Sequence, residues 1–407
     1  MHQYLGEEGE LGGVLSVDIE GVGQGSTDGS TRMAITAQLE ELKLKVLVKS
    51  LEDKRDRTAR PVLAWPNRDK LTTAFLLGLP GPNTSLSTPI MQEGLAMVLC
   101  LPSPALIGQV GERIGTGRVD LFGDELKTKA LAGDGWRTRH DRVKLELMRL
   151  FGWCGIVATC EVTGLFQHLI PQEALNSVEV QQARQVMIPD FRLQLPANSA
   201  PGLATPGLHL VPGQVETRLA ELKFCCGKSH YKPGTRQRRF ERAVDRRSGE
   251  LMGEYRKKAE HVDRLLGEQE GGMGRLRRRL DQFGQLIGIV IGLFNEASDD
   301  THQLLDTMAD SRVRKLARAT GLSHEQQAAE KGRVQGELRV QLSLASLRAG
   351  MACMLDRCHQ IGETAGLCAK RREASWRVEE EMRRVRQAQH LARVRGRHIL
   401  RRGHILV

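Results

Sequence analysis

Apolar and polar residues alternate in two short segments near the middle of the chain, residues 186–195 and 219–224. Side chains of an extended strand point alternately to its two faces. The odd-numbered positions from 191 to 195 are apolar in the first segment, and the even-numbered positions from 220 to 224 are apolar in the second. This alternation predicts two strands, each with one apolar face toward a core.

The polar faces of these two predicted strands carry the candidate chemistry. Pro189 and Asp190 stand in the first strand, and Glu221 and Lys223 share a face of the second. If the strands are neighbours, two carboxylates and one ammonium group meet at one point. Such a set can hold Mg²⁺ or Mn²⁺ against a phosphodiester and activate a water. The pattern therefore favours a metal-dependent nuclease with Asp190 and Glu221 as metal ligands.

The connection between the two strands, residues 196–217, contains four prolines and three glycines. This composition predicts a long irregular loop. The Glu-x-Lys pattern is itself common, since Glu-Leu-Lys also occurs at 41–43 and 125–127. An ordinary Glu–Lys pair on a solvated sheet face, worth about 0–1 kcal/mol, is therefore the alternative interpretation, and spacing alone leaves both open.

Hydrophobic periodicity around the two strands predicts further elements. They are a helix at 141–150, a strand at 156–166, a long basic helix at 236–266 with a break allowed at Ser248-Gly249, a strand at 286–294 and a helix from Asp299 or Asp300 to 316. The resulting order is helix, strand, strand, strand, helix, strand, helix. This alternation favours an α/β fold.

This order and the motif residues resemble the PD-(D/E)xK superfamily of restriction-like endonucleases over about residues 135–312. The resemblance implies a central mixed sheet flanked by helices. It also implies that Asp190 and Glu221 bind the metal and that Lys223 orients or activates the attacking water. Members often add an acid on the first helix, where Glu146 is the candidate.

Some members of that superfamily place Gln-x-x-x-Tyr on the helix after the lysine. Here only Tyr255 matches this pattern. Several short stretches are also similar to open reading frames of reverse-transcriptase-encoding retroelements: GDGWR at 133–137, HDRVK at 140–144, EVTGLF at 161–166, AVDRR at 243–247 and EAS at 296–298. This similarity implies a reverse transcriptase of the same element as a partner and a role in retroelement integration.

The chain departs from related retroelement proteins in two respects. It has no Cys/His zinc knuckle between residues 100 and 186, and no Tyr-x-Asp-Asp polymerase motif. The resemblance therefore implies a nuclease module separated from its polymerase. Work on chromosomal DNA implies a nuclear, or otherwise intracellular, location.

The charge of the chain agrees with an acidic polymer as its partner. The formal net charge is +11. Residues 371–407 hold eleven Arg against four Glu, and residues 236–258 hold nine basic residues against four acids. Clustered cations of this kind bind nucleic acid in a strongly salt-dependent way. Solvated helical faces are the alternative interpretation of both stretches.

The second basic stretch directly follows the predicted metal site, so it supplies the candidate DNA contacts. These candidates are Arg236, Arg238, Arg239, Arg242, Arg246, Tyr255, Arg256 and Lys257. Aromatic residues make up only 4% of the chain, which disfavours stacking platforms for single strands or RNA loops. Duplex DNA is therefore the expected partner.

Length and composition predict about two or three domains. We expect an acidic, glycine-rich disordered segment at 1–30, a mainly helical region at 31–134, the nuclease-like core at 135–318 and a basic helical region at 319–407. The N-terminal region is predicted to be helical at 36–51, 69–79 and 88–101. No signal sequence opens the chain, and no apolar run is long enough for a membrane span.

Three functions remain open at the level of sequence. The first is a Mg²⁺-dependent DNA endonuclease or nickase. The second is a nuclease fold that binds nucleic acid without catalysis. The third is a helical interaction protein whose basic ends meet an acidic partner, and it has no need for a pair of strands at 186–224.

Overall fold

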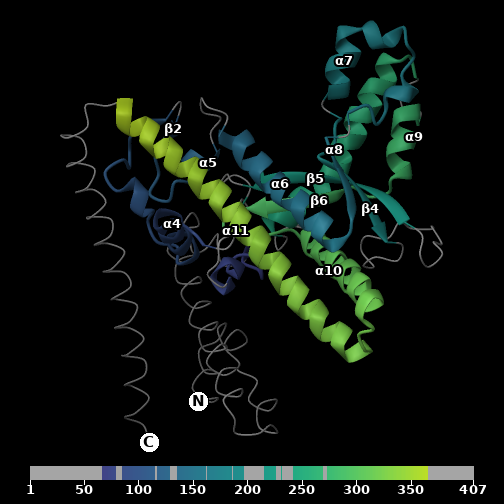
Figure 1. The fold of residues 1–407 in the computed structure, drawn as a ribbon. Coiled ribbons are helices and arrows are strands. Elements are labelled where there is room, and N and C mark those ends of the chain that lie inside the picture. Colours follow the sequence, from purple (N-terminus) through teal and green to yellow (C-terminus); the bar gives the residue numbers. More distant parts are fainter. Residues whose placement is uncertain are drawn as a thin grey trace, which may run out of the picture. The chain divides into compact units, whose positions relative to one another are not determined.

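The computed structural model describes residues 67–78, 85–114, 117–128, 135–161, 163–185, 187–196, 215–225, 231, 242–268 and 273–364. These residues belong to one compact unit, in which helices flank a four-stranded sheet (Figure 1). The predicted segment at 1–30, the predicted helix at 36–51 and the basic tail at 371–407 lie outside the described residues. Most of the predicted loop, residues 197–214, also lies outside them.

The sheet is mixed, with the strand order β3-β4-β5-β6. Strand β4 pairs antiparallel with both β3 and β5, whereas β5 and β6 are parallel. The strand bounds are β3 Val157–Cys160, β4 Phe191–Pro196, β5 Val215–Cys225 and β6 Ile287–Gly292. The α/β class and the predicted pairing of the two alternating segments are confirmed.

The long helices occur in the predicted order around these strands. Helix α6 precedes β3, α8 lies between β5 and β6, and α10 follows β6. Their bounds are α6 Gly135–Cys154, α8 Ala243–Leu265 and α10 Asp299–Thr320. Shorter elements without a predicted counterpart are inserted between them: η6 Gln167–Leu169, η7 Ala174–Asn176, α7 Val178–Gln185 and α9 Arg275–Gln282.

Several predicted boundaries differ from those in the structure for local reasons. The strand predicted at 156–166 ends at Cys160, because Glu161 and Gly164 adopt positive φ angles of 45° and 82°. Strand β4 begins after Pro189, which has no N–H to donate to the ladder. Helix α8 continues through Ser248 and Gly249 without the break that the sequence allowed.

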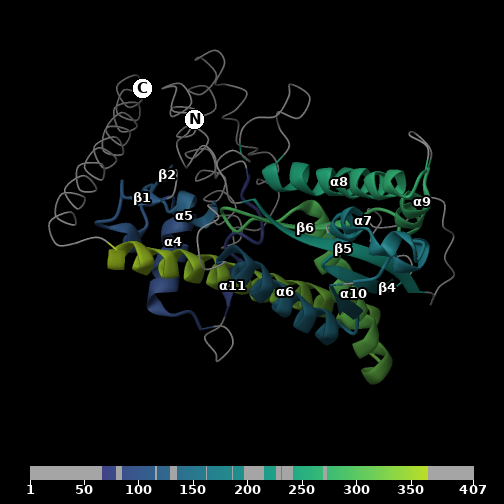
Figure 2. The same cartoon turned by 90° about the horizontal axis from the view of Figure 1, so that it is seen from above.

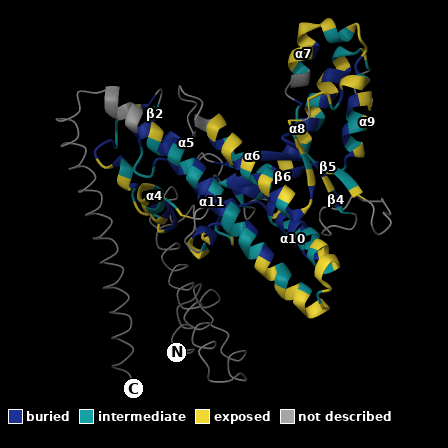
Figure 3. Cartoon of the chain, viewed as in Figure 1, coloured by how far each residue is buried: buried dark blue, intermediate teal, exposed yellow. Residues whose placement is uncertain are grey.

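Three layers form the core, as Figure 2 shows, with α8 on one side of the sheet and α6, α10 and α11 (His324–Thr364) on the other. The apolar faces of β4, β5 and β6 pack against α6, α10 and α11 in one cluster. Apolar residues of α8 and α9 form a second cluster on the opposite face. Figure 3 shows that β6 is almost entirely buried between these layers, and the middle of β5 is buried as well.

The segment before α6 packs against the C-terminal half of α11 in a third cluster. It contains η4 Ala74–Leu77, α4 Thr88–Val98, η5 Pro104–Leu106, the strands β1 Arg113–Ile114 and β2 Gly117–Arg118, and α5 Asp124–Thr128. The helix predicted at 88–101 is confirmed. The one predicted at 69–79 is wrong, because a turn and the single 3-10 helix η4 occupy that stretch.

Helix α11 joins this segment to the core, since it contacts α4 and α5 as well as α6 and α10. Helix α10 also runs past residue 318. The domain boundaries at 134 and 318 stay predictions. None of the helices in the described ranges combines the length and the hydropathy that a bilayer crossing requires.

Candidate functional site

Asp190 and Glu221 lie directly across from each other at one end of the β4–β5 pair. The register pairs Phe191 with Ala220, so the next position outward places Asp190 opposite Glu221. The backbone N–H of Leu222 donates to Asp190 Oδ2 at 2.9 Å, and the N–H of Asp190 lies 3.2 Å from Glu221 Oε2. The two predicted acids are therefore brought together, and both are buried, with 9% and 6% of their surface exposed.

Lys223 belongs to the same cluster, two residues further along β5. Its Nζ lies 2.6 Å from Glu221 Oε1, and 38% of the side chain is exposed. The predicted set of two carboxylates and one ammonium group is thus assembled at one point. Of the three, only the ammonium group is substantially open to solvent.

Tyr255 of α8 reaches the same acids from the opposite side of the sheet from α6. Its hydroxyl lies 2.8 Å from Glu221 Oε2 and 3.2 Å from the carbonyl oxygen of Ile188. Burial raises the pKa of this phenol far above its usual value, and the adjacent Glu221 charge adds to the effect. Tyr255 therefore stays protonated, and its hydroxyl donates a hydrogen bond to the Glu221 carboxylate. The sequence suggested that Tyr255 contacts DNA. This prediction is wrong, because the side chain is only 2% exposed and lies beneath the site.

Two basic residues of α6 complete the site, and the sequence analysis did not identify them. His140 Nε2 lies 3.1 Å from Asp190 Oδ2, and Lys144 Nζ lies 3.2 Å from Asp190 Oδ1. Lys144 also bonds Glu161 Oε1 at 2.8 Å. Positions 140 and 144 are one helical turn apart and share a face. That spacing, together with the acid Glu161 within the strand predicted at 156–166, was the available signal.

Basic side chains balance the negative charge of the carboxylates in this cluster. Burial raises the pKa of Asp190, but hydrogen bonding and charge from His140, the Leu222 N–H and Lys144 outweigh burial and lower the pKa below its usual value. Burial likewise opposes charge on His140 and Lys144, yet their acidic partners raise both pKa values. Both ring nitrogens of His140 face carboxylates, since Nδ1 lies 3.3 Å from Asp141. This arrangement suits the doubly protonated ring.

Glu146, the candidate acid on the first helix, lies away from this cluster. Two residues along a helix correspond to a rotation of about 200°, so Glu146 and Lys144 occupy different sides of α6. Glu146 instead binds Arg149, with Oε1 2.5 Å from the guanidinium. The helix thus brings a lysine and a histidine to Asp190 in place of the expected acid.

The acid pair fits a small, hard divalent cation in its chemistry. Mg²⁺ is commonly held by one or two carboxylates together with waters and substrate phosphates. The cations already gathered at Asp190 show that this position favours positive charge. Among the described residues, no group of three or more His, Cys, Asp or Glu side chains is arranged to hold a metal ion. Asp190 and Glu221 are the two carboxylates that an ion at this place would meet.

Three arginines of the basic stretch expected to contact DNA, Arg242, Arg247 and Arg256, are paired with carboxylates. Arg242 lies within ion-pair distance of Asp69, Asp245 and Asp299, and Arg256 pairs with Asp281. Arg246 is half-buried and Lys257 is exposed. Arg236, Arg238 and Arg239 lie outside the described residues.

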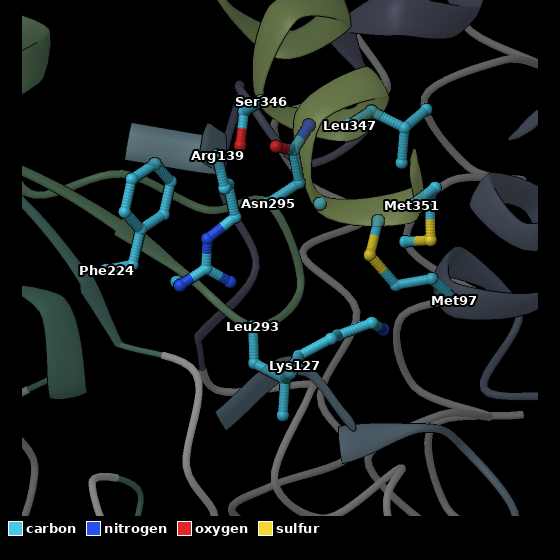
Figure 4. A pocket seen from close by; sticks show the side chains of 11 residues that line it. Met97, Lys127, Arg139, Phe224, Leu293, Asn295, Ser346, Leu347 and Met351 are labelled. Atoms are coloured by element: carbon cyan, nitrogen blue, oxygen red, sulfur yellow. The ribbon is translucent and has the colours of Figure 1, made fainter. Parts of the chain in front are cut away.

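A small cavity lies between the sheet and α11. It measures about 30 Å³, and its lining includes Arg139, Phe224 and Asn295 (Figure 4). The Arg139 guanidinium stacks 4.3 Å from the centre of the Phe224 ring. None of the residues of the acid cluster lines this cavity. Its volume suits one or two waters and not a substrate.

Comparison of the chain with family models, with curated proteins and with solved structures gives no match. The assignment of function therefore depends on the geometry of the site and on the arrangement of the elements that hold it.

Proposed function

We propose that this protein is a metal-dependent endonuclease with a restriction-endonuclease-like core that hydrolyses phosphodiester bonds in duplex DNA. One observation carries the proposal: Asp190 and Glu221 face each other across antiparallel strands, with the Lys223 ammonium group 2.6 Å from Glu221. The order of helix, three antiparallel strands, helix, parallel strand and helix supports it.

The residues of the site divide the chemistry among them. A Mg²⁺ or Mn²⁺ ion held by Asp190 and Glu221 would supply an activated water and offset charge on the scissile phosphate. Tyr255 fixes the orientation of Glu221 from beneath the sheet. Lys223 offers an exposed ammonium group where negative charge develops. Strand β5 holds Glu221 and Lys223, and Asp190 immediately precedes β4, so the pairing of β4 with β5 sets their relative positions.

The retroelement resemblance suggests the setting of this activity. We propose that the cleavage serves integration of a retroelement, with a reverse transcriptase of the same element as partner and nuclear DNA as substrate. His140, Lys144 and Glu161 of the site lie in two of the stretches that carry this resemblance. The proposal of this setting rests on those stretches alone.

One observation favours a second candidate, a nuclease fold that binds DNA without cutting it. Both carboxylate oxygens of Asp190 already accept hydrogen bonds from protein groups, namely Lys144, His140 and the Leu222 N–H. A metal ion has to compete with these donors for the carboxylate. This candidate predicts salt-sensitive DNA binding without Mg²⁺-dependent cleavage.

Cleavage of supercoiled plasmid in Mg²⁺ separates the two candidates. We expect the wild type to nick or linearise the plasmid, and Asp190→Asn and Glu221→Gln to abolish cleavage because each removes a ligand charge. Lys223→Met should lower the rate about 10²- to 10³-fold, the usual cost of losing one group that stabilises developing charge.

Glu146→Gln is the matched control, since it removes a carboxylate from the same helix that holds His140 and Lys144, but on another side. It should leave the rate unchanged. Binding to the same DNA in EDTA should be retained in all four variants. A wild type that binds DNA but does not cut it would support the second candidate, and an Asp190→Asn protein that cuts as fast as the wild type would contradict the proposed site.

A further inference from the structure

A groove of about 580 Å³ lies at the end of the sheet opposite the acid pair. The end of α6, the ends of β3, β4 and β5, and the last turns of α10 form its walls. Asp190 precedes β4 and Pro196 ends it. Six residues of extended chain correspond to about 20 Å, so the groove is well separated from the acids.

Helix α10 lines the groove with a stripe of basic residues. Ser311, Arg314, Lys315 and Arg318 all line it, and their spacing of i, i+3, i+4 and i+7 places them on one side of the helix. The three basic side chains are exposed; Figure 3 shows this exposed end of α10. No acidic residue belongs to the lining.

These three cations have no carboxylate partner among the described residues. Arg314 donates to the carbonyl oxygen of Asp310, but the carboxylates of Asp306 and Asp310 face Lys331 of α11. Other basic side chains of the described residues, such as Arg242 and Arg333, are paired with carboxylates. Like charges one turn apart on a helix repel each other, so the stripe is unfavourable until an anion meets it.

The helix dipole accounts for only part of the stripe. Cations are favoured in the last turn of a helix, and Arg318 lies there. Arg314 and Lys315 precede the last turn and need another reason. In the turn after α6, Gly155 has a φ of 76°, and a Cβ at this position would meet the Lys315 side chain at 3.3 Å. The absence of a side chain at Gly155 therefore leaves room for Lys315.

We propose that this groove binds the phosphate backbone of duplex DNA, as a second contact for the DNA that the acid pair would cut. The choice of DNA as partner rests on the proposed function. The lining contains no aromatic side chain, whereas aromatic residues are enriched at protein–protein interfaces and provide stacking platforms for single strands. An open groove with three unpaired cations matches a backbone of regularly spaced charges.

The test measures binding of a duplex of about three helical turns by fluorescence anisotropy at several NaCl concentrations, in EDTA. The proteins compared are Asp190→Asn alone and Asp190→Asn combined with Arg314→Gln, Lys315→Gln and Arg318→Gln. Each neutralised phosphate contributes about 0.9 to the slope of log K against log salt. We expect the triple substitution to lower that slope by two to three and to weaken binding at low salt at least tenfold.

The matched control is Arg149→Gln, Arg275→Gln and Arg333→Gln, which changes the net charge equally at surface positions that are already paired. It should leave the slope nearly unchanged. Equal slopes for the two triple variants would overturn the proposal, as would a groove variant that loses binding to poly-glutamate but not to DNA. Because binding is read without metal, a protein that never cuts DNA can still pass this test, so failure of the proposed cleavage is seen separately.

Discussion

Asp190 shows how the site keeps buried charges compatible with folding. Its carboxylate is nearly enclosed, and an enclosed charge without partners is strongly destabilising. Lys144, His140 and the Leu222 N–H supply the compensation. Glu161 and Glu221 are compensated in the same way by Lys144 and Lys223. The cluster therefore forms a connected network, in which Asp190 has three donors and Lys144 has two carboxylate partners.

The sequence could predict the strand-borne part of this network and not the helix-borne part. Alternation alone places Asp190, Glu221 and Lys223 on matching faces, because the side-chain period of a strand is fixed. The rotation of α6 relative to the sheet depends on how its apolar side packs against the strands. For that reason the sequence favoured Glu146, whereas packing brings His140 and Lys144 to the acids.

Glu296 gives a prediction of pH-dependent stability at the residue scale. Complete burial raises the pKa of its carboxyl from 4.5 to about 7, although hydrogen bonds from Tyr231 and the Phe294 N–H oppose this shift. In the unfolded chain the carboxyl ionises near pH 4.5. Between these values the folded state binds the extra proton, so its contribution to stability is full below about pH 4.5 and is lost as the pH rises to about 7.

Urea unfolding at pH 4.5 and pH 7.5 tests this prediction by comparison with Glu296→Gln. The wild type should lose on the order of 3 kcal/mol more of its free energy of unfolding over this interval than the variant does. Parallel pH profiles for the two proteins would contradict the prediction, because they would show that folding does not shift the pKa of Glu296.

At the scale of elements, close packing of α8 on β6 determines where α8 can continue. A Cβ at Gly288 would lie 1.9 Å from Ser248 Oγ, and that hydroxyl bonds Asp300 at 2.5 Å. Ser248 therefore ties α8 to the start of α10 across the bare backbone of β6. This tertiary contact explains why α8 continues where local propensity allowed a break, and local sequence could not reveal it.

Gly288→Ala should destabilise the protein by about 1–3 kcal/mol, because the added methyl group overpacks the contact between α8 and β6. Gly249→Ala is the control, since it lies next to Ser248 on the exposed side of α8 with no atom near its Cβ position. That change should be neutral or stabilise by up to about 1 kcal/mol, as expected for alanine in a helix. Thermal unfolding measures both effects, and a Gly288→Ala protein as stable as the wild type would contradict this packing.

At the scale of the molecule, the pairing of basic residues does not follow how densely they occur in the sequence. Arg242 and Arg256 of the basic stretch at 236–258 pair with carboxylates from distant parts of the sequence, namely Asp69, Asp299 and Asp281. The stripe on α10 contains only three basic residues, but none of them has a carboxylate partner among the described residues. Composition gives the number of cations, whereas only the fold shows which of them have carboxylate partners.

The whole-molecule arrangement also sets the relation between the two proposed DNA contacts. The acid pair and the α10 groove lie at opposite ends of β4, about 20 Å apart. Helices α6 and α10 pack along the sheet between these two places. A single rigid layer therefore holds both contacts, and their spacing does not depend on a loop.

The proposed catalysis requires that Asp190 and Glu221 share a divalent ion. Anomalous scattering from crystals of the protein soaked in Mn²⁺ with a short duplex measures this directly. We predict a peak within about 2.0–2.3 Å of a carboxylate oxygen of each residue, the range for oxygen ligands of such ions, and its loss in Asp190→Asn. An Mn²⁺ peak elsewhere in the molecule, with Lys144 and His140 still bonded to Asp190, would contradict the claim.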